Sequence, residues 1–159
     1  VTNLTEQQIC DLYAGKLQSW RNVGGAEHPV TLLTRPPTEV DPEVIRAKLS
    51  CFRELVPAAS AQVMARGGDM AAALAHAPHS IGMTSMTVVT QSRGRIRALT
   101  LGGVPAPPDN IRLGRYPLTR DFLFVYRGAG SGGLQHFLEF VKSDAGAAVI
   151  LANGAVPER

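Results

Sequence analysis

Only two cysteines and one tryptophan occur among the 159 residues. The cysteines form no CxxC pair and no other metal-ligand spacing, so the sequence carries no zinc or redox motif. An apolar run of ~20 residues, which a membrane-spanning helix needs, is also missing. The overall composition, 45% apolar and 18% charged, is typical of one globular domain rather than of a disordered chain.

The two cysteines, Cys10 and Cys51, lie in separate predicted helices. They can form one disulfide in an oxidising compartment if their Cα atoms come within ~7 Å of each other. Sequence alone does not show that approach. We therefore expect two unpaired thiols.

The chain carries a small excess of positive charge, and this excess is concentrated in one segment. The net charge is +3, yet seven arginines lie between Arg93 and Arg127, against only Asp109 and Asp121. Such a stripe attracts anions or nucleic acid. Because no nucleic-acid motif accompanies it, we favour a solvated face and expect no nucleic-acid partner.

The chain begins with a well-marked helix signal. Thr5 and Gln8 have the spacing of a capping box, and Gly15 supplies a left-handed stop. Between them an apolar face is formed by Ile9, Leu12 and Tyr13. Trp20 is expected to be buried against this first helix.

Further along, apolar patterns alternate between the two kinds of element. Strands are expected at residues 29–34, 80–86, 95–101 and 121–126. Helices are expected at residues 41–52, 69–77, 133–143 and 144–154, the first two capped by Asp41 and Asp69. Strands that alternate with helices favour α/β architecture.

Four segments resemble, in order, the phosphate-type periplasmic solute-binding proteins of ABC transporters. The first is "LTEQQICDLYAGKLQSWRNVGG", and the second is "VMARGGDMAAALAHAPHSIGMTSM". They are followed by "RALTLGGVPAPPDNIRLGRYPLTRDFLFVYRG" and by "GLQHFLEFVKSDAGAAVILANGAVPE". Together these segments cover nearly the whole chain.

The resemblance implies a periplasmic-binding-protein-like lobe of type II, with a mixed sheet flanked by helices. Residues 1–112 correspond to the second lobe, and residues 113–159 to a crossover strand and C-terminal helices. In this family an N-terminal lobe with a glycine-rich anion loop precedes the unit. We therefore expect either a fragment of a longer protein or a naturally short, one-lobed relative.

The resemblance also implies an anion site. In the family an arginine after a strand, followed by a Ser-Gly-Thr helix start, holds the anion, and "TLLTR" places Arg35 at that arginine. Amides at a helix N-terminus favour negative charge, and a guanidinium adds paired hydrogen bonds. Thr38 offers a hydroxyl nearby, although an ordinary loop residue is the favoured interpretation.

Directly after the arginine the sequence departs from the family pattern. Residues 39–41 (Glu-Val-Asp) stand where Ser-Gly-Thr is expected, and prolines at residues 36–37 remove two amide donors. Two carboxylates repel phosphate, so we expect binding no tighter than ~1 mM. An ion pair of Arg35 with Glu39 or Asp41 is as well supported as anion binding, and both interpretations stay open.

No other motif indicates a nucleotide-binding, metal-binding or catalytic site. The glycine-rich residues 128–133 lack the lysine and spacing of a nucleotide-binding loop, and Pro78 breaks the helix that would align His76 with His79. The sequence contains no recognisable catalytic arrangement and implies no cofactor or metal.

The resemblance implies a periplasmic or extracytoplasmic receptor lobe that binds phosphate or a similar small oxyanion and delivers it to an ABC permease. The alternative is a sensory or interaction protein that kept the fold and lost the anion cradle. Without another lobe, the apolar C-terminal side chains cannot all be buried: Phe137, Phe140, Val149 and Ile150. We then expect a homodimer through the C-terminal helices.

Overall fold

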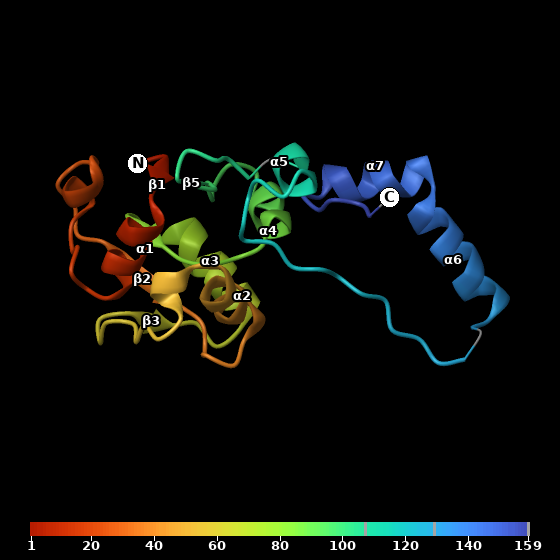
Figure 1. The fold of residues 1–159 in the computed structure, drawn as a ribbon, viewed down its shortest axis with the longest axis horizontal. Coiled ribbons are helices and arrows are strands. Elements are labelled where there is room, and N and C mark those ends of the chain that lie inside the picture. Colours follow the sequence, from red (N-terminus) through yellow and green to blue (C-terminus); the bar gives the residue numbers. More distant parts are fainter. Residues whose placement is uncertain (107, 129, 159) are drawn as a thin grey trace.

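A computed structural model describes residues 1–106, 108–128 and 130–158. Figure 1 shows two parts, which we call the body (residues 1–112) and the C-terminal segment (residues 113–158). The body carries all the strands among the described residues. The C-terminal segment leaves the body as an extended arm and returns towards it through two helices.

The strands of the body form two small parallel sheets. β2 (Thr31–Thr34) is the central strand of one sheet, with β3 (Gln62–Val63) on one side and β4 (Ser80–Ile81) on the other. β1 (Asn3–Leu4) pairs with β5 (Thr100–Leu101) in the second sheet. The expected α/β class is confirmed, and among the described residues antiparallel pairing is confined to isolated bridges.

Helices surround these sheets. Those of the body are α1 (Glu6–Tyr13), α2 (Val40–Lys48), α3 (Gly67–His76), α4 (Met86–Gln91) and α5 (Pro108–Arg112), with 3-10 turns η1 (Trp20–Val23) and η2 (Ser50–Phe52). The C-terminal segment contributes α6 (Gly132–Lys142) and α7 (Asp144–Ala152). The capping box of Thr5 and Gln8 is present at α1, and Gly15 follows the helix with φ +76, so both end signals are confirmed.

Two apolar clusters lie on the two sides of β2. Leu33 points into one cluster, with Tyr13, Leu49 and Met70. Leu32 points into the other, against which the half-buried Trp20 packs. Trp20 is less buried than expected. Its indole nitrogen donates to the carbonyl of His79 at 2.8 Å in an exposed hydrogen bond.

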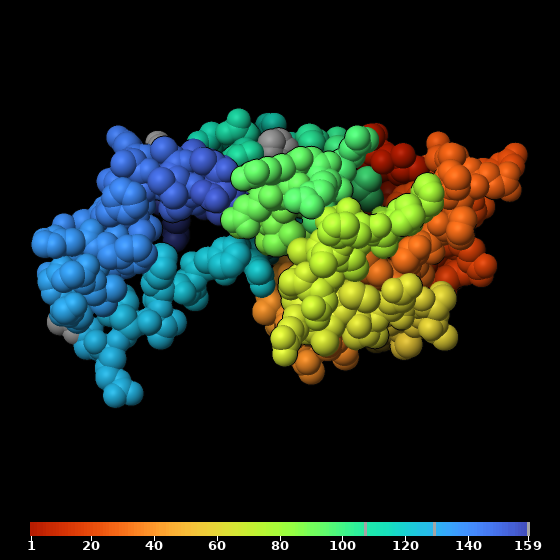
Figure 2. Space-filling model, turned by 180° about the vertical axis from the view of Figure 1, so that it is seen from behind, coloured from red at the N-terminus to blue at the C-terminus, as the bar shows by residue number. Residues whose placement is uncertain are grey.

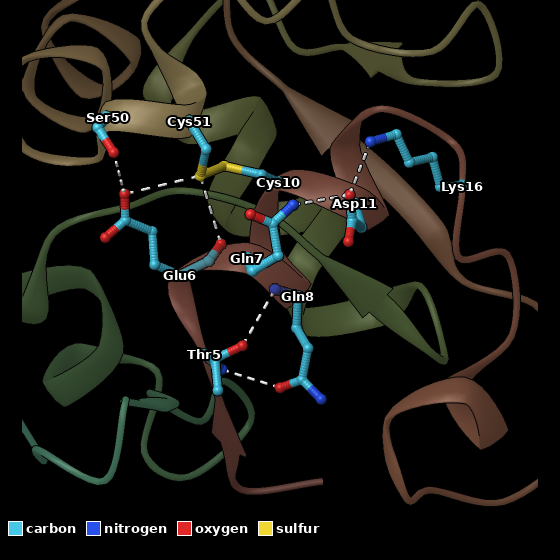
Figure 3. Close-up of a disulfide and its surroundings, with 9 residues drawn as sticks. All are labelled: Thr5, Glu6, Gln7, Gln8, Cys10, Asp11, Lys16, Ser50 and Cys51. Carbon is cyan, nitrogen blue, oxygen red and sulfur yellow. Dashed lines mark hydrogen bonds and ion pairs between the residues drawn. A yellow bond between two sulfur atoms is a disulfide. The ribbon is translucent and has the colours of Figure 1, made fainter.

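The expectation of unpaired thiols is wrong. Cys10 in α1 and Cys51 in η2 form a disulfide, with their Cα atoms 6.2 Å apart (Figure 3). Beside it, the Ser50 hydroxyl donates to the Glu6 carboxylate at 3.1 Å. Pairing the two helices brings together cysteines that are 41 residues apart in the chain, a proximity that sequence spacing does not reveal.

Several element boundaries also differ from expectation. α2 begins at Val40 with Glu39 as N-cap, rather than at Asp41. α3 begins at Gly67, and Asp69 accepts from the Arg66 amide at 3.1 Å from within the first turn. The strands expected at residues 80–86 and 95–101 shrink to two residues each, and α4 replaces the end of the first.

The strand expected at residues 121–126 does not form. The segment is extended, but within the described chain its backbone pairs with no other strand. Its apolar side chains are more than half exposed, and Val125 is 93% exposed. Figure 2 shows this arm standing apart from the body across an open notch. An apolar pattern alone does not make a strand, because a strand also needs a neighbouring edge.

Loss of the disulfide should weaken the body. Replacing both cysteines by serine reopens a long chain loop in the unfolded state, so the free energy of unfolding should fall by about 2–4 kcal/mol. Urea denaturation of the oxidised protein and of the double variant measures this difference. Equal midpoints and slopes would show that the cross-link contributes nothing.

Tyr13 should make stability fall at alkaline pH. Burial raises the pKa of this phenol well above its usual range, and its hydroxyl donates to the Leu33 carbonyl at 2.9 Å. The unfolded chain therefore loses this proton first, and stability should be constant below about pH 10 and decline above it. Tyr13→Phe should cost about 1 kcal/mol at neutral pH and flatten that decline, apart from the share of Tyr116, whose pKa burial also raises. An unchanged alkaline slope in urea titrations would contradict the assignment.

Candidate functional site

Arg35 lies where two parallel strands end. It follows β2 directly, and Met64 follows β3 directly. The Met64 amide donates to the carbonyl of Thr34 at 2.8 Å and thereby closes the edge beside Arg35. Ligands of parallel α/β sheets bind at the carboxyl ends of the strands, so the sequence places Arg35 at the edge where a ligand is expected.

The Arg35 side chain is buried, with only 7% of its surface exposed. Its Nη1 donates to the Met64 carbonyl at 3.0 Å, and its Nη2 donates to Glu39 Oε2 at 2.8 Å. A carboxylate oxygen of Asp41 lies 3.9 Å from Nε. The ion pair that the sequence left open is therefore present, with both acidic residues contributing.

One nitrogen of this guanidinium makes no hydrogen bond within the described residues. Arg35 Nε is inaccessible to solvent and has no hydrogen-bond partner among the described residues. Asp41 at 3.9 Å attracts it electrostatically but is too far for a hydrogen bond. A buried donor without an acceptor is costly, so this atom identifies a position where an acceptor oxygen would stabilise the site.

The first turn of α2 differs from an open anion cradle. Glu39 occupies the N-cap, but its side chain makes no capping bond within the described structure, since it is drawn to Arg35 instead. Asp41 and Glu43 add negative charge to the same turn. These carboxylates already compensate the positive end of the helix dipole, and Pro42 removes one more amide donor.

Thr38, the other expected binding residue, is exposed. No hydrogen bond of its hydroxyl is found in the described part of the chain. The loop around it is held by Arg46, which donates to the Pro37 carbonyl at 2.9 Å, and by a turn from the Glu39 amide to the Pro36 carbonyl at 3.0 Å. The structure thus brings Arg35 and Glu39 together but leaves Thr38 beside them at the surface.

Scaffold contacts keep this edge in place. Tyr13 binds the Leu33 carbonyl two residues before Arg35. Leu49, at the end of α2, is buried with Phe52 in the cluster that contains Tyr13. The disulfide joins α1 to η2, which follows α2 closely. The strand that carries Arg35 and the helix that carries Glu39 are therefore anchored to the same first helix.

The weaker sequence candidates lie elsewhere. His76 bonds to the Ala72 carbonyl of its own helix at 2.9 Å, whereas His79 stacks on His28 with ring centroids 3.9 Å apart. Ser131 caps α6 by accepting from the Leu134 amide at 3.4 Å. Over the described ranges, no group of three or more potential metal ligands is found.

Sequence reasoning named Arg35, Glu39 and Asp41 but missed Met64. Met64 contacts Arg35 through its backbone carbonyl. Because every residue type has such a carbonyl, the sequence gives no signal for this contact. No helix of the described chain is long and apolar enough to cross a membrane.

The fold and this strand-edge site define a class of protein. The chain belongs to the PBP superfamily, because the family described as "PBP superfamily domain" matches residues 1–145. Among curated relatives, the phosphate-binding protein PstS of Bacillus subtilis (strain 168) is 24% identical over 160 residues, which cover 99% of this chain and 51% of the relative. PstS of Borreliella burgdorferi is 21% identical over 97% of this chain and 58% of the relative.

Solved structures agree on the fold. A structure described as a phosphate ABC transporter substrate-binding protein with bound phosphate, from Clostridium perfringens, superposes with a TM-score of 0.83 at 24% identity, covering all of this chain and 64% of that one. An ABC-type phosphate transport receptor from Vibrio cholerae superposes with a TM-score of 0.69 at 25% identity, covering 98% and 64%. The chain spans about half the length of the curated relatives it matches.

Proposed function

We propose that this chain is a solute-binding lobe of an extracytoplasmic receptor that holds a small, phosphate-like oxyanion and delivers it to an ABC permease. The observation that carries the proposal is Arg35, buried at the carboxyl end of β2 beside the first turn of α2. Arg35 is the main residue that binds the solute, and Thr38 offers a hydroxyl at the surface. The lobe binds and releases its solute and has no catalytic role.

Localisation outside the cytoplasm is supported by the disulfide. Cys10 and Cys51 are paired, and structural disulfides persist in oxidising compartments such as the periplasm. The relatives are phosphate-binding proteins and phosphate transport receptors, which is consistent with the same location.

A division of the chain into two units is supported by the distribution of buried side chains. We propose that residues 1–112 form the solute-binding lobe and that residues 113–159 form a crossover strand with two helices. Nearly all buried apolar side chains of the described residues lie before residue 113, with Ala147 as the exception. The second unit therefore depends on a partner surface for its own burial.

Phosphate should bind weakly to the isolated chain. We expect a dissociation constant no tighter than ~1 mM, equal to about −4 kcal/mol, because Glu39 and Asp41 face the same guanidinium. NMR titration should move the amides of Val40 and Asp41, and Arg35→Ala should abolish those shifts, whereas Arg53→Ala at an exposed position should not. Micromolar binding that Arg35→Ala abolishes would show an intact cradle, and shifts that persist in Arg35→Ala would place the anion elsewhere.

A second candidate function, an interaction module with the same fold, is favoured by the arm. Leu123 and Val125 are 82% and 93% exposed. In the described structure, the backbone of residues 120–127 makes no hydrogen bond. On the other face, Phe124 meets Phe137 of α6 with ring centroids 5.4 Å apart. We propose that a second copy covers this arm and the C-terminal helices.

The arm is self-complementary in one antiparallel register. If two copies pair about a two-fold axis at Phe124, Asp121 lies opposite Arg127 of the second copy, and Phe122 lies opposite Tyr126. Cross-strand pairs of opposite charge and of aromatic rings are favourable. Strand pairing would also satisfy the backbone donors and acceptors on the facing edge of each arm.

Charge exchange tests this dimer. Asp121→Arg and Arg127→Asp should each weaken self-association by about 0.2–1 kcal/mol per broken pair, because like charges then face each other. The double exchange should restore it. Sedimentation equilibrium of the four proteins measures the dissociation constants. A monomeric wild-type chain, or a double variant as weak as the singles, would contradict this register.

A further inference from the structure

On the side of the Arg35 guanidinium that carries Nε and Nη2, only Nη2 has a hydrogen-bond acceptor among the described residues. An arginine presents Nε and one Nη as two parallel donors, which match two oxygens of a carboxylate or phosphate. Here Glu39 takes only Nη2, at 2.8 Å. The neighbouring Nε is buried and lacks an acceptor among the described residues. Glu39 therefore accepts one of the two hydrogen bonds that an anion could accept from Arg35 and leaves the other unmade.

Glu39 is placed so that it can leave. Its side chain is 41% exposed, whereas that of Arg35 is 7% exposed. As the N-cap of α2 it makes no capping bond within the described structure. Rotation of this side chain into solvent thus breaks one ion pair and no contact that the helix needs. Arg35 itself stays fixed by the Met64 carbonyl at 3.0 Å.

We propose that Glu39 is a built-in, displaceable competitor for Arg35, and that the site takes singly charged oxyanions in preference to dianions. The inference rests on the proposed function, since it assumes that solute binds at Arg35. An incoming ligand replaces the Glu39 carboxylate on Nη2 and supplies the acceptor that Nε lacks. Binding therefore exchanges one contact of Arg35 for two.

The charge preference follows from what remains after Glu39 leaves. Asp41 stays 3.9 Å from Nε, and its side chain is only 26% exposed. A monoanion restores the single negative charge that Glu39 had contributed. A dianion adds one more beside Asp41, where low exposure limits screening by solvent. Asp41 is thus the residue that discriminates by charge, and Glu39 is the residue that limits affinity.

The experiment compares acetate, a monoanion, with sulfate, a dianion, on the full chain. NMR titrations are run on the wild type, on Glu39→Gln and on Glu39→Gln/Asp41→Asn. The matched control is Glu43→Gln, which removes the same charge from the same helical turn at an exposed position. Circular dichroism and thermal unfolding confirm that each variant is folded.

Wild-type chain should bind acetate more tightly than sulfate. Glu39→Gln should tighten acetate binding by about tenfold, and Glu43→Gln should change it much less. The additional Asp41→Asn change should tighten sulfate more than acetate. The Arg35 Nε–H resonance offers a direct readout, because it should shift in Glu39→Gln without ligand and shift again when acetate is added.

Three results would overturn the inference. Equal effects of Glu39→Gln and Glu43→Gln would show general electrostatics and no specific competitor. Unchanged acetate affinity in Glu39→Gln, with the wild type still binding through Arg35, would refute the competitor but leave the proposed function intact. Absence of binding by every variant would refute the proposed function together with the inference.

Discussion

The buried charge of Arg35 constrains the structure between the end of β2 and the first turn of α2. A guanidinium taken out of water must be paired, because an unpaired buried charge costs far more than a hydrogen bond returns. Glu39, Asp41 and the Met64 carbonyl are gathered around it. The Glu39 side chain pairs with Arg35 and makes no capping hydrogen bond at α2 within the described structure. The position of the arginine, rather than helix propensity, sets the local geometry.

Contacts from the rest of the body support this arrangement. β2 is hydrogen-bonded on both sides by parallel neighbours, and its two inward residues, Leu32 and Leu33, enter different clusters. The disulfide and the Tyr13 hydrogen bond connect α1 to η2 and to β2. Ion pairs are sensitive to small displacements, so a strand held on both sides is a suitable support for a buried one. The most exposed charged group of the site is the Glu39 carboxylate.

Sequence reasoning worked where the signal is local. The capping box at Thr5 and the stop at Gly15 depend on neighbours along the chain, and both are confirmed. The strand expected at residues 29–34 also forms, over Thr31–Thr34. It failed where formation needs a distant partner. The disulfide required an approach of two helices, and the apolar arm at residues 121–126 required a strand edge that the described residues do not provide. At the site, Arg35 and its acidic partners were readable from the sequence, but the Met64 carbonyl and the unpaired Nε are visible only in three dimensions.

The two units differ in what they need from other molecules. The body contains nearly all the buried apolar side chains of the described residues, and it pairs its buried Arg35 with its own Glu39 and Asp41. The C-terminal segment leaves Phe137, Phe140 and Val149 about half exposed, and its arm leaves backbone groups without partners in the described chain. An exposed, unpaired apolar strand associates readily with any available sheet edge. The buried Arg35 and the exposed arm lie in different parts of the chain, so we expect substitutions at residues 121–127 to change the proposed self-association without disturbing the proposed solute site at Arg35.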